Sequence, residues 1–211
     1  MDYIAYISTK DGDSLAVRSK PNGEKIDFLT NGSEVSVKGE PVYAGDRNWV
    51  QIAANRWVAK EFLTVIKGAR VVAARSSKTI SGGLRVYETR LIDGTGKVVK
   101  TVRAISGRAN KQTPSHIANS QAPLPFGIYT FTYPGIVEFK GGEFGGVWSP
   151  VIPAFKTGRT ELGIHYDPSA LLQNANSGTV GCFATPTVEE RDTMTNFIRT
   201  YKPTHFIVYE G

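Results

Sequence analysis

Short runs in which apolar and polar residues alternate fill most of this chain, a pattern typical of β-strands with one buried face. In the first third, such runs include residues 15–21, 32–37, 48–52 and 55–58, with turn-forming residues between them. They predict about five short strands, and a single hairpin would bury too little apolar surface to be stable. We therefore expect a small barrel over residues 1–66.

Small and basic residues at positions 67–69 separate this unit from a second one, which covers residues 70–211. Within it, the runs 84–89 and 98–103 flank an Asp-Gly-Thr-Gly turn, which is a strong signal for a β-hairpin. The chain has 22 glycines and 11 prolines, and this many turn residues agrees with β structure built from short strands.

One segment near the C-terminus has the apolar spacing of a helix. Thr187 and Glu190 form a capping-box sequence at its start, and Pro203 ends it. A last apolar run, residues 205–209, predicts a closing strand. We therefore expect a mainly β protein, in which a small barrel precedes a second β domain with one helix near its C-terminus.

The composition limits the partners of this chain. Its net charge of +6 favours anionic partners, but no arginine-rich helix or aromatic sheet motif supports binding of nucleic acid. No run approaches the about 18 to 20 apolar residues that a membrane span needs, and no secretory signal is visible at the start. No cluster of His, Cys, Asp and Glu has the spacing of metal ligands, so we expect neither a metal nor a cofactor.

The candidate chemistry lies around the single cysteine, Cys182, and a histidine upstream, His165, in the strand-like run 162–166. A thiol needs a base to become a strong nucleophile near neutral pH, and an imidazole titrates in that range. Gly181 suits a tight turn in which backbone N–H groups bind the oxyanion that forms when a thiolate attacks a carbonyl. The alternative is a buried thiol that packs as a small hydrophobe.

Two other stretches are open to more than one interpretation. Residues 107–123 are polar and turn-prone, which predicts a surface loop or a flap over a substrate, and they contain His116 as a weaker candidate for a second base. The glycine-rich residues 141–146 have neither a phosphate-binding lysine nor a following helix signal, so they predict a hairpin turn. His205 shares a strand face with apolar residues, which indicates a structural role.

The residues around the cysteine resemble the signature of the L,D-transpeptidase (YkuD-type) family. Thr179, Gly181, Cys182 and the apolar Phe183 match that signature position by position, and His165 falls where the base of the family falls. Residues upstream, Leu-Pro-Phe-Gly-Ile-Tyr, resemble the proline-glycine-aromatic turn that precedes the catalytic region. The resemblance implies a YkuD-type β-sandwich with a cysteine nucleophile, a histidine base and backbone amides at the oxyanion.

The sequence also departs from the family pattern near the proposed site. Val180 stands where many members have a second histidine, Tyr166 replaces a glycine or serine, and Ala184 replaces an asparagine or arginine. These changes affect the substrate more than the reaction type. We expect Thr179 and Tyr166 to line the substrate site, with Arg159 as a candidate cation for a carboxylate; a solvated surface arginine is the alternative interpretation.

Residues 1–66 resemble bacterial SH3-like (SH3b) domains, which share the Val-Arg-Ser-x-Pro start and the closing Trp-Val pair. Such domains accompany wall-active enzymes and hold them on peptidoglycan, and the same fold also serves as a spacer. For Trp49 and Trp57 we expect core packing, whereas Tyr43 lies in a loop and is the better candidate for a ligand contact.

Together these resemblances imply a monomeric enzyme of the cell envelope, in the periplasm or the cell wall, that modifies peptidoglycan. It would transfer the acyl group of a tetrapeptide stem through a cysteine thioester, and its partners would be stem peptides and glycan. Hydrolysis of wall peptides, by an L,D-carboxypeptidase or endopeptidase, is one alternative. A peptidase of the NlpC/P60 type fits less well because that family places its cysteine before its histidine. A non-catalytic wall-binding protein is a further alternative.

Overall fold

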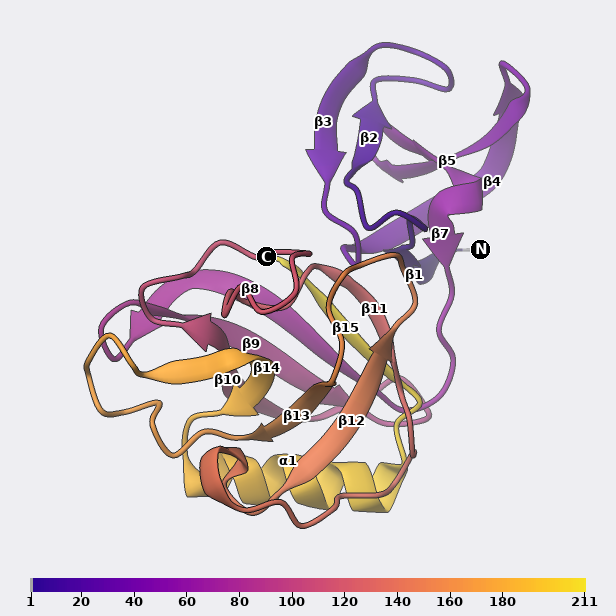
Figure 1. The fold of residues 1–211 in the computed structure, drawn as a ribbon. Helices are drawn as coiled ribbons and strands as arrows, with labels where there is room; N and C mark the ends of the chain where they lie inside the picture. The colour runs from indigo at the N-terminus through magenta and orange to yellow at the C-terminus, as the bar shows by residue number, and fades with distance from the viewer. Residues whose placement is uncertain (1) are drawn as a thin grey trace.

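The computed structural model describes residues 2–211 as two β units that follow one another in the chain (Figure 1). The first unit is one antiparallel sheet of seven strands in the order β3-β2-β6-β5-β4-β1-β7. Its elements are β1 (Tyr3–Ile7), β2 (Leu15–Arg18), β3 (Lys25–Leu29), β4 (Glu34–Ala44), β5 (Arg47–Ala53), β6 (Arg56–Ala59), η1 (Lys60–Phe62) and β7 (Leu63–Thr64).

Alternation in these strands places one set of side chains in a shared apolar cluster, as the sequence pattern predicts. The cluster contains Ala5, Ile7, Leu15, Val17, Val35, Val37, Val50 and Val58. The sheet has more strands than expected. One of the additional strands, β3, has the alternating sequence Lys-Ile-Asp-Phe-Leu, but nearly all its side chains are exposed, so this alternation does not mark a buried face. Trp49 is buried and Trp57 is half-buried, whereas Tyr43 is exposed. Tyr43 lies in β4, where it pairs with Asn48, and not in the expected loop.

The second unit is a closed barrel of eight strands in the order β10-β14-β13-β12-β11-β15-β8-β9. Its elements are β8 (Arg70–Ile80), β9 (Leu84–Ile92), β10 (Val98–Arg108), β11 (Gly127–Phe131), η2 (Gly142–Phe144), β12 (Trp148–Pro153), β13 (Leu162–Tyr166), β14 (Gly178–Thr185), α1 (Val188–Tyr201) and β15 (His205–Glu210). The expected sandwich of two sheets is therefore replaced by a barrel, because parallel pairing of β15 with β8 and of β13 with β14 closes the ring of hydrogen bonds.

Two local predictions for this unit, the hairpin and the helix, are confirmed. Strands β9 and β10 form the expected hairpin, and Asp93 Oδ1 accepts hydrogen bonds from the backbone N–H groups of Thr95 and Lys97 in its turn. Helix α1 begins after Thr187, whose hydroxyl accepts the N–H of Glu190, and it ends at the left-handed Lys202. No helix in the described residues has the length and apolar character that crossing a membrane requires.

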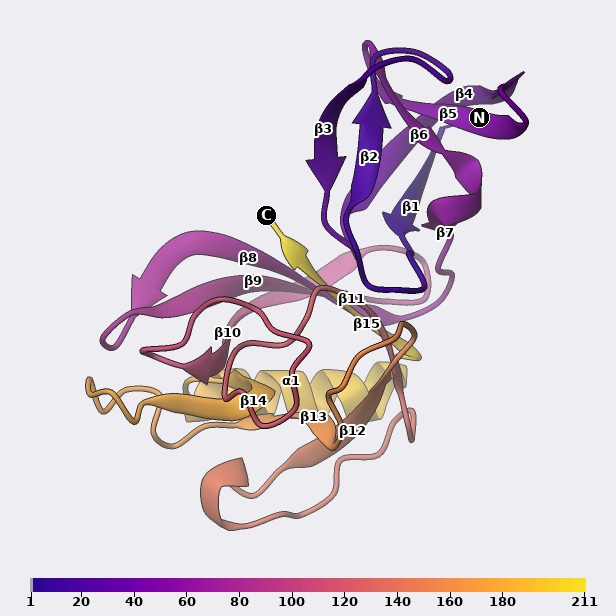
Figure 2. The same ribbon diagram turned by 45° about the horizontal axis from the view of Figure 1, so that its top comes forward.

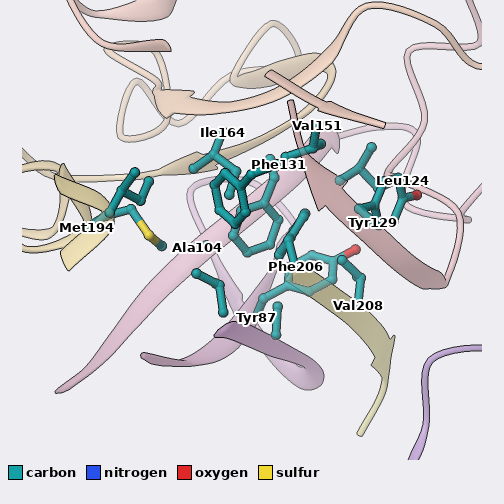
Figure 3. Packing of buried hydrophobic residues seen from close by; sticks show 14 of the residues in the cluster. Tyr87, Ala104, Leu124, Tyr129, Phe131, Val151, Ile164, Met194, Phe206 and Val208 are labelled. Atoms are coloured by element: carbon teal, nitrogen blue, oxygen red, sulfur yellow. The ribbon is translucent and has the colours of Figure 1, made fainter. Parts of the chain in front are cut away.

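The core of the barrel is rich in aromatic side chains that pack edge to face or tilted against one another (Figure 3). Tyr87 meets Phe183 with ring centroids 5.4 Å apart, and Phe206 lies 4.7 Å from Phe183. Helix α1 adds Met194 and Phe197 to this core, and it lies on the side of the barrel away from the N-terminal sheet (Figures 1 and 2). Side chains of the barrel strands that do not point into this core are the ones available to form a site.

The two units are in contact through a shared apolar cluster. It joins Tyr6 and Ile66 to Val72, Ile92, Ile128 and Ile207 of the barrel. Beside it, Arg90 forms an ion pair with Glu34 at 2.9 Å. The N-terminal sheet therefore covers barrel side chains that its removal would expose to water.

Candidate active site

Strands β13 and β14 run side by side in parallel and bring the two candidate residues together (Figure 1). Their register pairs Ile164 with Phe183, and both of these side chains lie in the barrel core. Because side chains alternate along a strand, His165 and Cys182 share the other face, one diagonal step apart. Both line a single cleft of about 810 Å³.

The sulfur of Cys182 interacts with two backbone groups. Its Sγ is 3.8 Å from the carbonyl oxygen of Glu161, which accepts the thiol proton, and the backbone N–H of Gly163 stabilises the thiolate form. Glu161 has a positive φ of 54°, a conformation that costs a non-glycine residue energy and that here turns its carbonyl toward the thiol. The Glu161 carbonyl thus stabilises the protonated thiol, and the Gly163 N–H stabilises the thiolate.

Burial raises the pKa of the Cys182 thiol, and charges around the cleft modify this effect. The N–H of Gly163 and the cations of Arg159 and Lys140 lower the pKa, because they stabilise the thiolate, whereas the carboxylate of Glu143 raises it. Desolvation is the largest of these causes, so the thiol is protonated near pH 7.

The imidazole of His165 is held in one tautomer by its own neighbour. Its Nδ1 lies 2.8 Å from the carbonyl oxygen of Tyr166. A carbonyl can only accept a hydrogen bond, so Nδ1 carries the proton and Nε2 keeps its lone pair. The ring packs against Phe144 at 5.2 Å and Trp148 at 6.2 Å between centroids. Burial lowers the pKa of His165 below its usual value, which keeps the ring neutral near pH 7.

The resting pair is therefore a neutral thiol beside a neutral imidazole. Among the described residues, Cys182 donates to the Glu161 carbonyl, and no hydrogen bond joins its sulfur to His165. Hydrogen bonds between catalytic groups are often long before substrate binds. A neutral imidazole with a free Nε2 can accept the thiol proton when the sulfur reacts, which is the arrangement of a general base rather than of a preformed ion pair.

Two buried hydroxyls hold the turn that presents the cysteine. Thr179 Oγ1 donates to the carbonyl of Cys182 at 2.7 Å and accepts the N–H groups of Gly107 and Gly181, each at 3.0 Å. Ser106 Oγ donates to the same Cys182 carbonyl at 2.8 Å. Thr179, expected to line the substrate site, borders the cleft, but its hydroxyl is used inside the protein and fixes the turn.

Both backbone polar groups of Gly181 are hydrogen-bonded within the protein. Its N–H donates to Thr179, and its carbonyl accepts Arg159 Nη2 at 2.9 Å. The expected donation from Gly181 N–H to an oxyanion is therefore not available in this conformation, and Gly163 N–H is the amide that the structure places at the sulfur. Gly181 has φ +121°, which favours glycine, and a side chain there would overlap Arg159.

Arg159 is a buried side chain, with 6% of its surface exposed, so its interpretation as a solvated surface residue is wrong. Arg159 borders the cleft, but both of its terminal nitrogens, Nη1 and Nη2, donate hydrogen bonds to the protein. Nη1 donates to carbonyls of Ser115, Ala122 and Pro123 and to the hydroxyl of Ser120, at 3.1 to 3.4 Å. These bonds leave it poorly placed to bind a substrate carboxylate.

The remaining candidates lie outside the cleft. The Tyr166 ring lies under the guanidinium of Arg191 at 5.5 Å and against Gly145, and it is not among the described residues that line the cleft. Tyr166 contributes its carbonyl to His165 instead. His116 is exposed and packs on Phe155, away from the cysteine.

The other positions of interest are also placed by the barrel. His205 is half-buried on β15 and bonds the hydroxyl of Thr204. Val180 is 43% exposed at the turn, whereas Ala184 is fully buried beside Leu84 and Ile105. A larger polar residue at position 184 would therefore not face a substrate in this fold.

Sequence reasoning missed one wall of the cleft, which the loop before β12 provides. Residues 141–146 do not form a simple hairpin turn: they contain η2, whose Phe144 covers His165. Lys140 lies over the rings of Phe144 and Trp148 at 4.3 and 4.4 Å. The Trp148 ring fills the space where a Gly163 side chain would stand. The sequence signal for this wall was the presence of Phe144 and Trp148 in and beside the glycine-rich residues 141–146.

Both acidic and basic residues border this cleft. In the described part of the chain, no group of three or more His, Cys, Asp or Glu side chains is arranged to hold a metal ion. Comparison of the chain with protein-family models, with curated proteins and with solved structures finds no match. Its function is therefore inferred from the residues of the cleft.

Proposed function

We propose that this protein is a cysteine acyltransferase that modifies peptidoglycan stem peptides, in the manner of an L,D-transpeptidase. One observation supports this most: Cys182 and a His165 held in its Nδ1–H tautomer share one face of adjacent parallel strands in one cleft. The resemblance of residues 164–183 to the family signature supplies the substrate class.

The chemistry follows from the protonation states. His165 Nε2 accepts the thiol proton as the Cys182 sulfur attacks the carbonyl carbon of the third residue of a tetrapeptide stem. Gly163 N–H, which stabilises the thiolate, is our candidate donor for the developing oxyanion. The imidazolium then gives its proton to the departing amine of the terminal D-residue. An acceptor amine releases the acyl group from the thioester.

The charges of the cleft suit a substrate that carries both carboxylate and amine groups. Lys140 and Arg108 border the cleft as cations, and Glu143, Glu161 and Asp167 border it as acids. Lys140 is exposed and lies on the aromatic wall beside His165, so it is better placed than Arg159 to meet a carboxylate of the donor.

The proposal also includes a role for each of the two β units. We infer that residues 1–66 are an SH3b-like unit that binds wall polymers and that residues 70–211 are a YkuD-type catalytic domain, acting as a monomer in the cell envelope. The curled antiparallel sheet with an exposed Tyr43 supports the first inference. The cysteine and histidine on neighbouring strands support the second.

Covalent labelling by a carbapenem, which acylates thiols of this class, tests the nucleophile. Cys182→Ala should abolish labelling, and His165→Ala should slow it by several orders of magnitude because base and nucleophile act together. His205→Ala is the matched control, since this histidine lies on the same barrel but does not border the cleft; it should label at the parent rate. Equal labelling of the parent and Cys182→Ala would refute the assignment.

Transfer and hydrolysis are separated by the product. The protein is incubated with a tetrapeptide muropeptide and an excess of a free D-amino acid, and the products are identified by mass spectrometry. Exchange of the fourth residue or a cross-linked dimer indicates transfer. Tripeptide alone, at saturating acceptor, would show that water is the acceptor and that the protein is an L,D-carboxypeptidase.

A further inference from the structure

Arg159 is a buried cation for which the described residues provide no carboxylate partner. Within residues 2–211, its hydrogen bonds go to five backbone or hydroxyl oxygens, and it takes part in no ion pair. Burial lowers the pKa of Arg159, yet an arginine stays protonated at any pH at which proteins fold. The charge is therefore permanent.

This arrangement is costly unless an anion is available. Removing a cation from water without an opposite charge is strongly unfavourable, and carbonyl dipoles compensate it only in part. The other deeply buried arginine of the barrel, Arg75, shows the usual solution, because it pairs with the carboxylate of Glu210 at 3.1 Å. Arg159 differs in lacking such a partner.

The position of Arg159 indicates which anion is missing. Nη2 donates to the carbonyl of Gly181, the residue before the nucleophile, and the guanidinium occupies the space that a Gly181 side chain would take. Among the electrostatic neighbours of Arg159 is the sulfur of Cys182 itself. The titratable or charged side chains that border the cleft besides these are Arg108, Lys140, Glu143, Glu161, His165 and Asp167.

We propose that Arg159 is a positioning residue whose buried charge is neutralised by the Cys182 thiolate and which locks the turn that carries the thiol. The thiol proton moves to His165, the sulfur becomes the anion that the guanidinium lacks, and Arg159 stays protonated throughout. The inference rests on the proposed role of Cys182 as a nucleophile, but not on the identity of the acyl donor. It assigns Arg159 a role other than binding substrate.

Alkylation by iodoacetamide tests this without any substrate, because its rate follows the thiolate fraction. In Arg159→Met we expect the rate profile to shift to higher pH, with a loss of rate at pH 7.5 that approaches tenfold for each unit of pKa. Arg159→Lys keeps the charge and should recover much of the rate. Arg75→Lys is the control for disturbing a buried arginine, and it should leave the profile unchanged. A parent profile in folded Arg159→Met would overturn the proposal.

A second pair of variants keeps the test valid if Arg159→Met does not fold. Cys182→Asp and Cys182→Asn are nearly isosteric, and only the first carries an anion. Next to an unpaired guanidinium, Cys182→Asp should unfold at a urea concentration at least as high as Cys182→Asn at pH 7. A markedly lower midpoint for Cys182→Asp would show that Arg159 does not need an anion at this position. Neither the alkylation rate nor the urea midpoint requires a peptide substrate. If the protein did not process muropeptides, the proposed function would fail, but both tests of Arg159 would still be valid.

Discussion

Substitution of Gly181 by alanine is the sharpest perturbation of the turn that carries Cys182. The methyl group would overlap Arg159 Nη2 and stand 3.0 Å from its Cζ and 3.1 Å from the carbonyl oxygen of Ala122. The φ of +121° is also one that residues with a side chain rarely adopt. Neither neighbour can give way easily, because one is a buried guanidinium held by several carbonyls and the other is backbone.

Two contributions set the expected cost. A non-glycine residue in such a backbone conformation costs about 1–3 kcal/mol. Displacing the guanidinium breaks its bond to the Gly181 carbonyl, and a hydrogen bond to a charged group contributes about 1.5–3 kcal/mol. Alanine restricts the unfolded chain and returns roughly 0.4–1 kcal/mol. Gly181→Ala should therefore lower the free energy of unfolding by about 1.5–5.5 kcal/mol, or the Tm by roughly 3–22 °C in a chain of this size.

Thermal and urea unfolding, followed by circular dichroism, measure this loss, and iodoacetamide reports on the thiol in the same samples. Gly141→Ala is the matched control: its φ is −76° and no atom lies within 4 Å of the added methyl group, so its stability should change by less than about 1 kcal/mol. If Gly181→Ala were as stable as Gly141→Ala and alkylated like the parent, the packing of Arg159 on this turn would be refuted.

Three further outcomes follow from the structure. Glu143→Gln removes a charge that raises the pKa of both His165 and Cys182, so the acid limb of the acylation rate and the alkylation profile should both move to lower pH; unmoved profiles would contradict this. Thr179→Val leaves the buried N–H groups of Gly107 and Gly181 without their acceptor and should cost about 1–3 kcal/mol in urea unfolding, whereas Thr179→Ser should stay near the parent. Deletion of residues 1–66 exposes the shared apolar cluster and should lower the Tm of the remaining barrel; an unchanged Tm would show that the two units are independent.

The sequence by itself determined the elements whose signals are local. The capping box of Thr187, the turn at Asp93 and the alternation in β2, β4, β5 and β6 act within a few residues, so these elements could be predicted without knowing their neighbours. The pairing of one cysteine with a histidine upstream was visible in the same way. Sequence could nominate Cys182 and His165 because their side chains carry the chemistry.

Only the tertiary structure decided how these elements combine. Closure of the barrel depends on β15 pairing in parallel with β8, which lies more than a hundred residues away, and no local pattern specifies such a contact. The burial of Arg159 depends on carbonyls of residues 115–123, a stretch that reads as polar surface. Thr179 was expected to contact substrate, but in the structure its hydroxyl supports the turn. Its hydrogen bond to Gly107, 72 residues away in the chain, could not be read from the local sequence.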